Sequence, residues 1–133
     1  SDSINNLIGR VLLANIRNKD ELKTIYDPAV GYGNSLLSIA KQDVDIAIYG
    51  QEIHNESAVF AIMNLIVNGI EDMDIRVGDT LFNPQFIQND KIRRFDLIVS
   101  HPPYRVKNYN RYDADVSEIV IWMQHFSRIL LPP

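Results

Sequence analysis

The chain has 133 residues, of which 46% are hydrophobic and 23% charged, as in ordinary globular domains and unlike collagen-like or disordered chains. It has no cysteine, which excludes disulfide frameworks, thiolate zinc sites and cysteine nucleophiles, and fits a cytoplasmic location. The net charge of −4 argues against binding nucleic acid through bulk positive charge alone. We expect one domain with no membrane span, signal peptide or metal site.

Apolar residues recur at helical spacing near the start of the chain, and short β-branched or aromatic runs follow. Consecutive apolar residues at 46–48 are typical of a strand buried on both faces of a parallel sheet. The alternation predicts an α/β fold with helices on both faces of that sheet. In chain order we predict a helix over 4–16, a strand over 23–26, a helix from 34 or 35 to about 42, a strand over 45–49, a helix over 55–67, a strand over 74–77, a polar loop over 83–94 with room for one helical turn, a strand over 95–99 and a helix over 117–130.

Ligands of parallel sheets bind beyond the carboxyl ends of the strands, so the segments after the strands are candidate sites. After the first strand, Gly31 and Gly33 let the backbone turn tightly and approach a ligand. A dinucleotide loop would have a third glycine at position 36, which is Leu here, and Asp27 would repel a phosphate. A ligand with an amino or sulfonium group fits better, and a plain strand-to-helix turn is the alternative.

Two carboxylates follow the second and third strands. Glu52 lies 21 residues after Gly31, where nucleotide-binding sheets hold ribose hydroxyls, although an acid also suits the start of a helix. Asp79 has the position to accept a hydrogen bond from an adenine amino group or to close an Asx-turn. The neighbouring Ile53 and Leu81 suit either a flat ring or the core.

The stretch Ser100-His101-Pro102-Pro103-Tyr104 follows the fourth strand. Its two prolines fix the backbone and supply no amide donors, which leaves carbonyl acceptors beside an aromatic ring. This arrangement suits a planar substrate that carries an amino group. The alternative is a strand ended by proline, with a packed tyrosine.

Together these segments resemble the N6-adenine DNA methyltransferases, most closely the modification subunit of bacterial type I restriction-modification systems. The likeness runs from about residue 4 to 130, in the family's motif order and at its usual spacings. The segments that carry it are 27–37 (DPAVGYGNSLL), 49–52 (YGQE), 78–81 (GDTL) and 95–104 (FDLIVSHPPY).

The resemblance implies a Rossmann-like methyltransferase fold with S-adenosylmethionine as the methyl donor. It implies DNA as the substrate, with the target adenine flipped out of the duplex, and specificity and restriction subunits as partners. The implied catalytic residues are His101, Pro102, Pro103 and Tyr104, with the Pro102 carbonyl as an acceptor and Tyr104 stacked on the base. The implied cofactor residues are Asp27, Ala29, Gly31 and Gly33 for the methionine part, Glu52 for the ribose, Ile53 and Leu81 for the adenine ring, and Asp79 for its amino group. Pro28 and Thr80 are also implied in cofactor binding, without a more specific role.

His101 stands where the family has Asn or Asp. A neutral histidine offers one acceptor nitrogen and a protonated one offers none. Three interpretations stay open: a working acceptor, a weakening substitution, or a domain without catalysis.

The chain also differs from the family in the number of strands, because four strands can be predicted from the sequence where the family has seven. We therefore interpret 1–133 as a partial catalytic domain, truncated after the fourth strand. It has an N-terminal helix over 1–22, a cofactor-binding half over 23–82 and the start of a target-base half over 95–133.

Other functions fit parts of the pattern. Enzymes that methylate protein glutamine or RNA guanine share the proline–proline–aromatic motif, and His101 suits a cofactor-binding or scaffold module that lacks catalysis. A nicotinamide-dependent dehydrogenase is disfavoured by Leu36 and Asp27. The basic and aromatic residues over 105–112 suit either a solvated loop or a contact with DNA phosphates.

Overall fold

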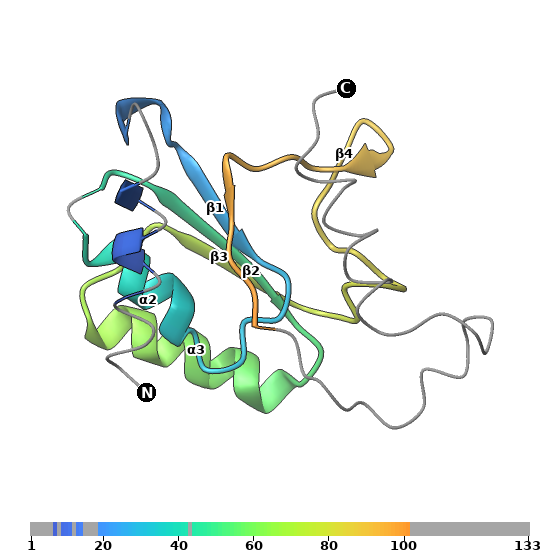
Figure 1. Cartoon of the computed structure of the whole chain (residues 1–133). Helices are drawn as coiled ribbons and strands as arrows, with labels where there is room; N and C mark the ends of the chain where they lie inside the picture. The colour runs from blue at the N-terminus through green and yellow to red at the C-terminus, as the bar shows by residue number, and fades with distance from the viewer. Residues whose placement is uncertain (1–6, 8, 12, 15–18, 43, 102–133) are drawn as a thin grey trace.

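A four-stranded parallel sheet forms the centre of the computed structural model, which describes residues 7, 9–11, 13–14, 19–42 and 44–101 (Figure 1). Residues 7, 9–11, 13 and 14 are helical, within the predicted N-terminal helix. Among these residues no helix has the length and apolar character needed to cross a bilayer. The elements are η1 (Lys19–Glu21), β1 (Thr24–Asp27), α2 (Asn34–Ala40), β2 (Ala47–Glu52), α3 (Asn55–Val67), β3 (Met73–Val77), β4 (Ile87–Gln88), β5 (Lys91–Ile92) and β6 (Leu97–Ile98).

The strand order β3-β2-β1-β6 places β1 in the interior of the sheet. The chain moves outward from β1 to β2 and β3, and then returns to lay β6 on the other side of β1. All three strand pairs are parallel, so the four carboxyl ends lie at one edge. The order reverses between β1 and β6, which makes their carboxyl ends the point where such sheets bind ligands.

Successive side chains of a strand point to opposite faces of the sheet, so alternate residues belong to two separate apolar clusters. Ile25 and Ile48 belong to the larger cluster, which includes residues of α2 and α3, and Figure 1 shows both helices on one side of the sheet. Tyr26 belongs to the other cluster, where its ring stacks on Phe95 with centroids 4.5 Å apart. The described helices thus cover one face, and the helix predicted over 117–130 lies outside the described residues.

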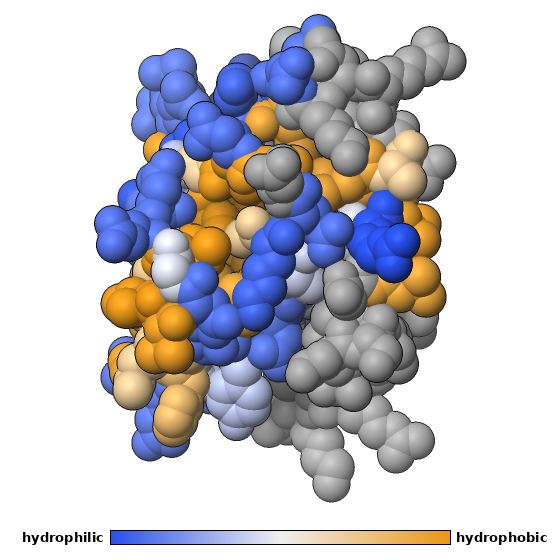
Figure 2. Space-filling view, turned by 90° about the vertical axis from the view of Figure 1, so that its left-hand side faces the viewer, coloured by the Kyte–Doolittle hydropathy of each residue, from blue (hydrophilic) through white to orange (hydrophobic). Residues whose placement is uncertain are grey.

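Helix α3 is apolar on its outer side as well as on its inner side. Ala58, Ala61 and Leu65 are buried against the sheet. The outer side exposes apolar residues at helical spacing, and Figure 2 shows apolar residues gathered low on one face of the molecule, at the level of α3. These exposed residues are Val59, Phe60, Met63, Ile66 and Val67.

Strand β2 is longer than predicted. The sequence indicates an end at Tyr49, but Gly50, Gln51 and Glu52 pair with Ile75, Arg76 and Val77 of β3. The glycine does not break the strand because both of its neighbours in the sheet hold it in register. Glu52 is therefore the last residue of a strand and not part of a flexible turn.

The helical turn expected within 83–94 is wrong. This segment contains an antiparallel hairpin in which Ile87 pairs with Ile92 and Gln88 pairs with Lys91. Asn89 and Asp90 form its two-residue turn, with φ of 52° and 59°. These residue types tolerate positive φ and favour tight hairpin turns, which is a signal that the polar composition of the loop obscured.

Gly50 allows the segment after β1 to lie directly on β2. A methyl group at Gly50 would overlap the Val30 side chain and would lie 2.8 Å from Ile75 Cδ1. Val30 also donates its backbone amide to the Gln51 carbonyl at 3.1 Å. The missing side chain at Gly50 thus fixes how closely the two segments approach.

We expect Gly50→Ala to destabilise the fold by about 1–3 kcal/mol, because it overpacks a filled site. Urea unfolding monitored by circular dichroism would measure this loss. Adding Val30→Ala removes the overlapping methyl groups and should recover part of it relative to the sum of the two single substitutions. Simple additivity of the two effects would contradict the proposed contact.

Candidate functional site

The segment that joins β1 to α2 forms a tight loop around Asp27. The Asp27 side chain is 1% exposed, and its Oδ1 accepts the Ala29 amide at 2.9 Å. Gly31 and Gly33 have φ of 55° and 78°, values that disfavour other residues. A Cβ at Gly33 would lie 3.3 Å from Ala61 Cβ of α3, whereas the space beside Gly31 is open. Gly33 therefore packs the loop on a helix, and Gly31 leaves room beside the loop.

Glu52 links this loop to the end of β2. Its Oε2 accepts the Gly31 amide at 2.8 Å, and its Oε1 accepts the His54 amide at 3.0 Å. The residue is only 7% exposed. A carboxylate oxygen has two lone pairs, so each oxygen keeps acceptor capacity for a further donor. Glu52 is thus a fixed acceptor at the edge where the ligand is expected.

The segment after β3 forms hydrogen bonds to Glu52 at the end of β2 and to Pro28 in the loop after β1. Gly78 donates its amide to the Glu52 carbonyl at 2.9 Å, and Thr80 donates its hydroxyl to the Pro28 carbonyl at 2.6 Å. Asp79 Oδ1 accepts the Leu81 amide at 3.0 Å in an Asx-turn, which was one of the two roles considered for it. This hydrogen bond leaves Oδ2 of the same carboxylate for another donor.

The predicted cofactor residues fall into one connected set at the carboxyl edge of the sheet. Hydrogen bonds join the loop after β1, the end of β2 and the segment after β3, so that Asp27, Glu52 and Asp79 lie in one connected region. Pro28 and Thr80 are buried and face each other, whereas Ile53 is 51% exposed and Leu81 is partly buried.

The predicted catalytic motif is described only at its start. His101 is exposed, three residues beyond the end of β6. Pro102, Pro103 and Tyr104 lie outside the described residues, as does the basic and aromatic stretch over 105–112.

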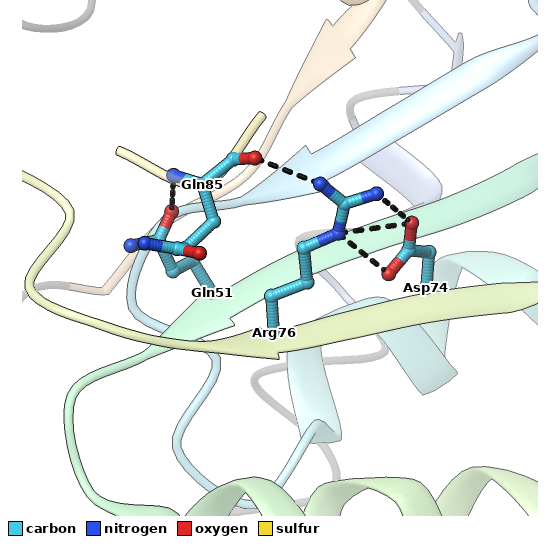
Figure 3. Close-up of polar contacts among 4 residues, drawn as sticks. All are labelled: Gln51, Asp74, Arg76 and Gln85. Carbon is cyan, nitrogen blue, oxygen red and sulfur yellow. Dashed lines mark hydrogen bonds and ion pairs between the residues drawn. The ribbon is translucent and has the colours of Figure 1, made fainter. Parts of the chain in front are cut away.

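Three polar residues near the site were not among the predicted site residues. The Gln51 side chain is completely buried and binds the backbone of the segment after β3 (Figure 3). Asn64 on α3 donates to the Tyr32 carbonyl at 2.9 Å, between the two loop glycines. The Ser100 hydroxyl is buried, and its interaction with the Asp27 carboxyl lowers the pKa of that carboxyl. Gln51 and Ser100 are polar residues inside the motif segments 49–52 and 95–104, which was the available signal, whereas Asn64 had none.

Burial dominates the electrostatics of the site. It raises the pKa of Asp27 to about 7, and the nearby Glu52 carboxylate adds to this rise, while the hydrogen bond from Ala29 opposes it. Burial also raises the pKa of Tyr26 above its usual value. Grouped carboxyls of this kind suit a ligand with cationic or hydroxyl donors and oppose an anionic one. Within the described part of the chain, no three side chains of His, Asp or Glu are grouped to hold a metal ion.

The sequence model of one family, described as N-6 DNA Methylase, matches residues 2–128. A type I restriction enzyme MjaVIII methylase subunit of Methanocaldococcus jannaschii is 30% identical over 116 residues, which cover 80% of this chain and 20% of that protein. A release factor glutamine methyltransferase of Fusobacterium nucleatum is 30% identical over 105 residues, which cover 71% of this chain and 28% of that protein. The chain therefore spans between about a fifth and under a third of the length of these relatives.

The fold also matches solved structures. A Listeria monocytogenes protein assigned to the class I S-adenosylmethionine-dependent methyltransferases superposes with a TM-score of 0.77 at 20% identity. The match covers 99% of this chain and 43% of that one. This confirms the predicted Rossmann-like methyltransferase fold.

Asp27 should make stability depend on pH. The unfolded chain loses this proton near pH 3.8, and the folded chain retains it to about pH 7. The free energy of unfolding should therefore fall as pH rises from about 4 to 7, by up to about 4 kcal/mol. Urea titrations across this range would measure it. Asp27→Asn should flatten the profile, whereas Asp79→Asn should preserve the slope because Asp27 is intact. Equal slopes for Asp27→Asn and the unsubstituted protein would contradict the assignment.

Proposed function

Because the chain belongs to the N-6 DNA methylase family, we propose that it is the core of an S-adenosylmethionine-dependent DNA adenine methyltransferase, the modification subunit of a type I restriction-modification system. The observation that carries the proposal is the joining of three loops around Glu52 at the carboxyl edge of the sheet. The fold, the family match and the polar groups at this edge of the sheet all support methyl transfer from S-adenosylmethionine.

The cofactor fits the described edge by its chemistry. Asp27, Ala29 and the glycine loop flank the methionine part, where a buried carboxyl suits an ammonium or sulfonium group and Gly31 leaves open space. Glu52 accepts the ribose hydroxyls with the lone pairs that the Gly31 and His54 amides leave free. The cofactor supplies an electrophilic methyl group to the bound base.

Residues after β2 and β3 would hold the adenine part of the cofactor. Ile53 and Leu81 flank the ring, and the Asp79 carboxylate accepts from its amino group. Pro28 and Thr80 act indirectly, because their mutual hydrogen bond holds the first and third loops together. On this proposal the cofactor-binding half spans 23–82.

The target half begins at 95 and continues through the proline motif. The N6 lone pair of adenine is delocalised into its ring, so the amino group is a weak nucleophile. Acceptors at His101 and at the Pro102 carbonyl bind its two hydrogens and favour a pyramidal nitrogen with a free lone pair. Tyr104 stacks on the flipped base. The nitrogen would take the methyl group as the S–CH3 bond breaks, S-adenosylhomocysteine would leave, and the nitrogen would release one proton to solvent.

The proposed setting follows from the same family. The substrate is duplex DNA, and the partners are a specificity subunit that reads the sequence and a restriction subunit, all in the cytoplasm. Since this chain is acidic, the specificity subunit and the remainder of the modification subunit supply most of the contacts with the DNA backbone.

A second candidate is methylation of a protein glutamine. The likeness to the Fusobacterium nucleatum enzyme favours it, because that protein is named for glutamine methylation. A product assay with DNA and a glutamine peptide in parallel separates the two. A third candidate is a cofactor-binding or scaffold module without catalysis, which His101 in place of the family's Asn or Asp favours.

Glu52→Ala should weaken S-adenosylmethionine binding by roughly 1.5–3 kcal/mol, because hydrogen bonds to a charged group are lost. Isothermal titration calorimetry would measure the dissociation constant. Glu56→Ala is the matched control, since Glu56 is an exposed acid in the first turn of α3. It should leave the affinity unchanged. An unchanged dissociation constant for a folded Glu52→Ala variant would remove Glu52 from the site.

His101→Asn should raise methyl transfer to DNA by roughly tenfold, because an amide oxygen is an acceptor in every protonation state. Transfer of a labelled methyl group to an oligonucleotide would measure the rate. The same oligonucleotide with N6-methyladenine at its adenines is the control substrate and should accept no label. No gain in a folded variant that binds the cofactor would argue against the motif assignment.

A further inference from the structure

The amide of Gln51 is the most deeply buried polar side-chain group near the site. The residue is 0% exposed, and both ends of the amide bind the backbone of one segment. Nε2 donates to the Asn83 carbonyl at 3.0 Å, and Oε1 accepts the Gln85 amide at 2.9 Å (Figure 3). If the segment moved away, a donor and an acceptor would remain buried without partners, which is costly. Gln51 therefore fixes the position of this segment.

Arg76 holds the same segment from β3. Its Nη1 donates to the Gln85 carbonyl at 2.7 Å, and its Nη2 lies 2.7 Å from Asp74 Oδ2. The guanidinium carbon also lies 4.3 Å from the centroid of the Phe86 ring. Figure 3 shows Gln85 held between Gln51 and Arg76. Two side chains on adjacent strands thus clamp one residue of the segment.

The clamp formed by Gln51 and Arg76 holds the segment after β3, and not the loop after β1. Gln51 and Glu52 are successive strand residues, so their side chains point to opposite faces of the sheet. The Gln51 backbone carbonyl, and not its side chain, accepts the Val30 amide of the first loop. A substitution of the Gln51 side chain therefore leaves in place the contacts to the glycine loop and to Glu52.

The clamped segment begins at the proposed adenine subsite. Asp79 and Leu81 lie just before the Asn83 and Gln85 backbone groups that Gln51 binds. A Cβ at Gly78 would lie 3.0 Å from Gln51 Nε2, so the glycine leaves room for the amide. The amide, the glycine and the segment therefore fit together as one unit.

We propose that Gln51 is a positioning residue that sets the preference for adenine in the cofactor, because it holds the backbone of Asn83 and Gln85 and, through the Asn83 amide that binds the Asp79 carbonyl, the segment that carries the Asp79 carboxylate. This inference rests on the proposed function. It assigns Gln51 no contact with the cofactor.

The test compares the dissociation constants of S-adenosylhomocysteine and S-inosylhomocysteine, in which a keto group replaces the 6-amino group. The unsubstituted protein should bind the adenine compound about tenfold or more tightly, as expected for a hydrogen bond to a charged group. Gln51→Met has a similar shape without the amide. This variant should reduce the ratio of the two dissociation constants (inosine compound over adenine compound) to near one, mainly because it binds the adenine compound more weakly. Its affinity for the inosine compound should change by less than about threefold.

Two further variants separate positioning from general stability. Arg76→Met loosens the clamp from a side chain that is 44% exposed, so it decides the question if Gln51→Met does not fold. It should also lower the ratio. Thr24→Val is the matched control, because Thr24 bonds Asp96 Oδ2 at 2.9 Å at the first residue of β1, away from the site. It should lower the melting temperature and leave the ratio unchanged.

The outcomes distinguish the two proposals. A ratio that stays at the unsubstituted value in both clamp variants overturns the role of Gln51 and leaves the proposed function standing. An unsubstituted protein that binds both compounds equally overturns this role together with the proposed contact between Asp79 and the amino group, and leaves the proposed methyl transfer standing. Failure of the folded unsubstituted protein to bind either compound overturns the proposed function, and this inference with it.

Discussion

The close approach of the first loop to strand β2 is the constraint on which the site depends. Gly50 has no side chain, so Val30 lies against the strand, and its amide reaches the Gln51 carbonyl. This contact brings Gly31 within hydrogen-bonding distance of Glu52. Without it, the loop and the carboxylate would belong to different parts of the surface. One missing side chain in a strand thus brings the glycine loop and Glu52 together at the carboxyl edge of the sheet.

The two faces of the sheet support this edge in different ways. The helical face is aliphatic, with Ile25 and Ile48 packed under α2 and α3. The other face is aromatic, and Tyr26, Phe86 and Phe95 form its buried cluster. Arg93 lies over the Tyr49 ring at 4.2 Å, which adds a cation to the aromatic face. The segment between β3 and β6 therefore covers one face of the sheet and carries Asp79 and Thr80 of the candidate site.

Motif residues could be predicted from the sequence better than the contacts that hold them. The order of strands and helices follows from local patterns, and α3 matches its predicted bounds of 55–67. The length of β2 could not be predicted, because Gly50 is a local breaker and only pairing with both neighbours overrides it. Glu52 was recognised as a candidate from its spacing, but its bonds to Gly31 and His54 require the fold.

Long-range polar contacts were the least accessible to sequence reasoning. Gln51 binds the backbone of residues 32 and 34 positions later, and a backbone partner leaves no signal in the residue type. The hairpin turn at Asn89 and Asp90 was recognisable in principle, because both residue types tolerate positive φ. It was missed because the flanking strands are only two residues each.

The double role of Glu52 has a consequence for how a ligand enters. Both carboxylate oxygens already hold backbone amides, so the first loop and the start of α3 are ordered by the folded chain itself. The conformational entropy of these loops is lost on folding, and binding need not remove it again. A ligand at the proposed site would therefore meet loops that the fold has already ordered, and its binding would cost less conformational entropy.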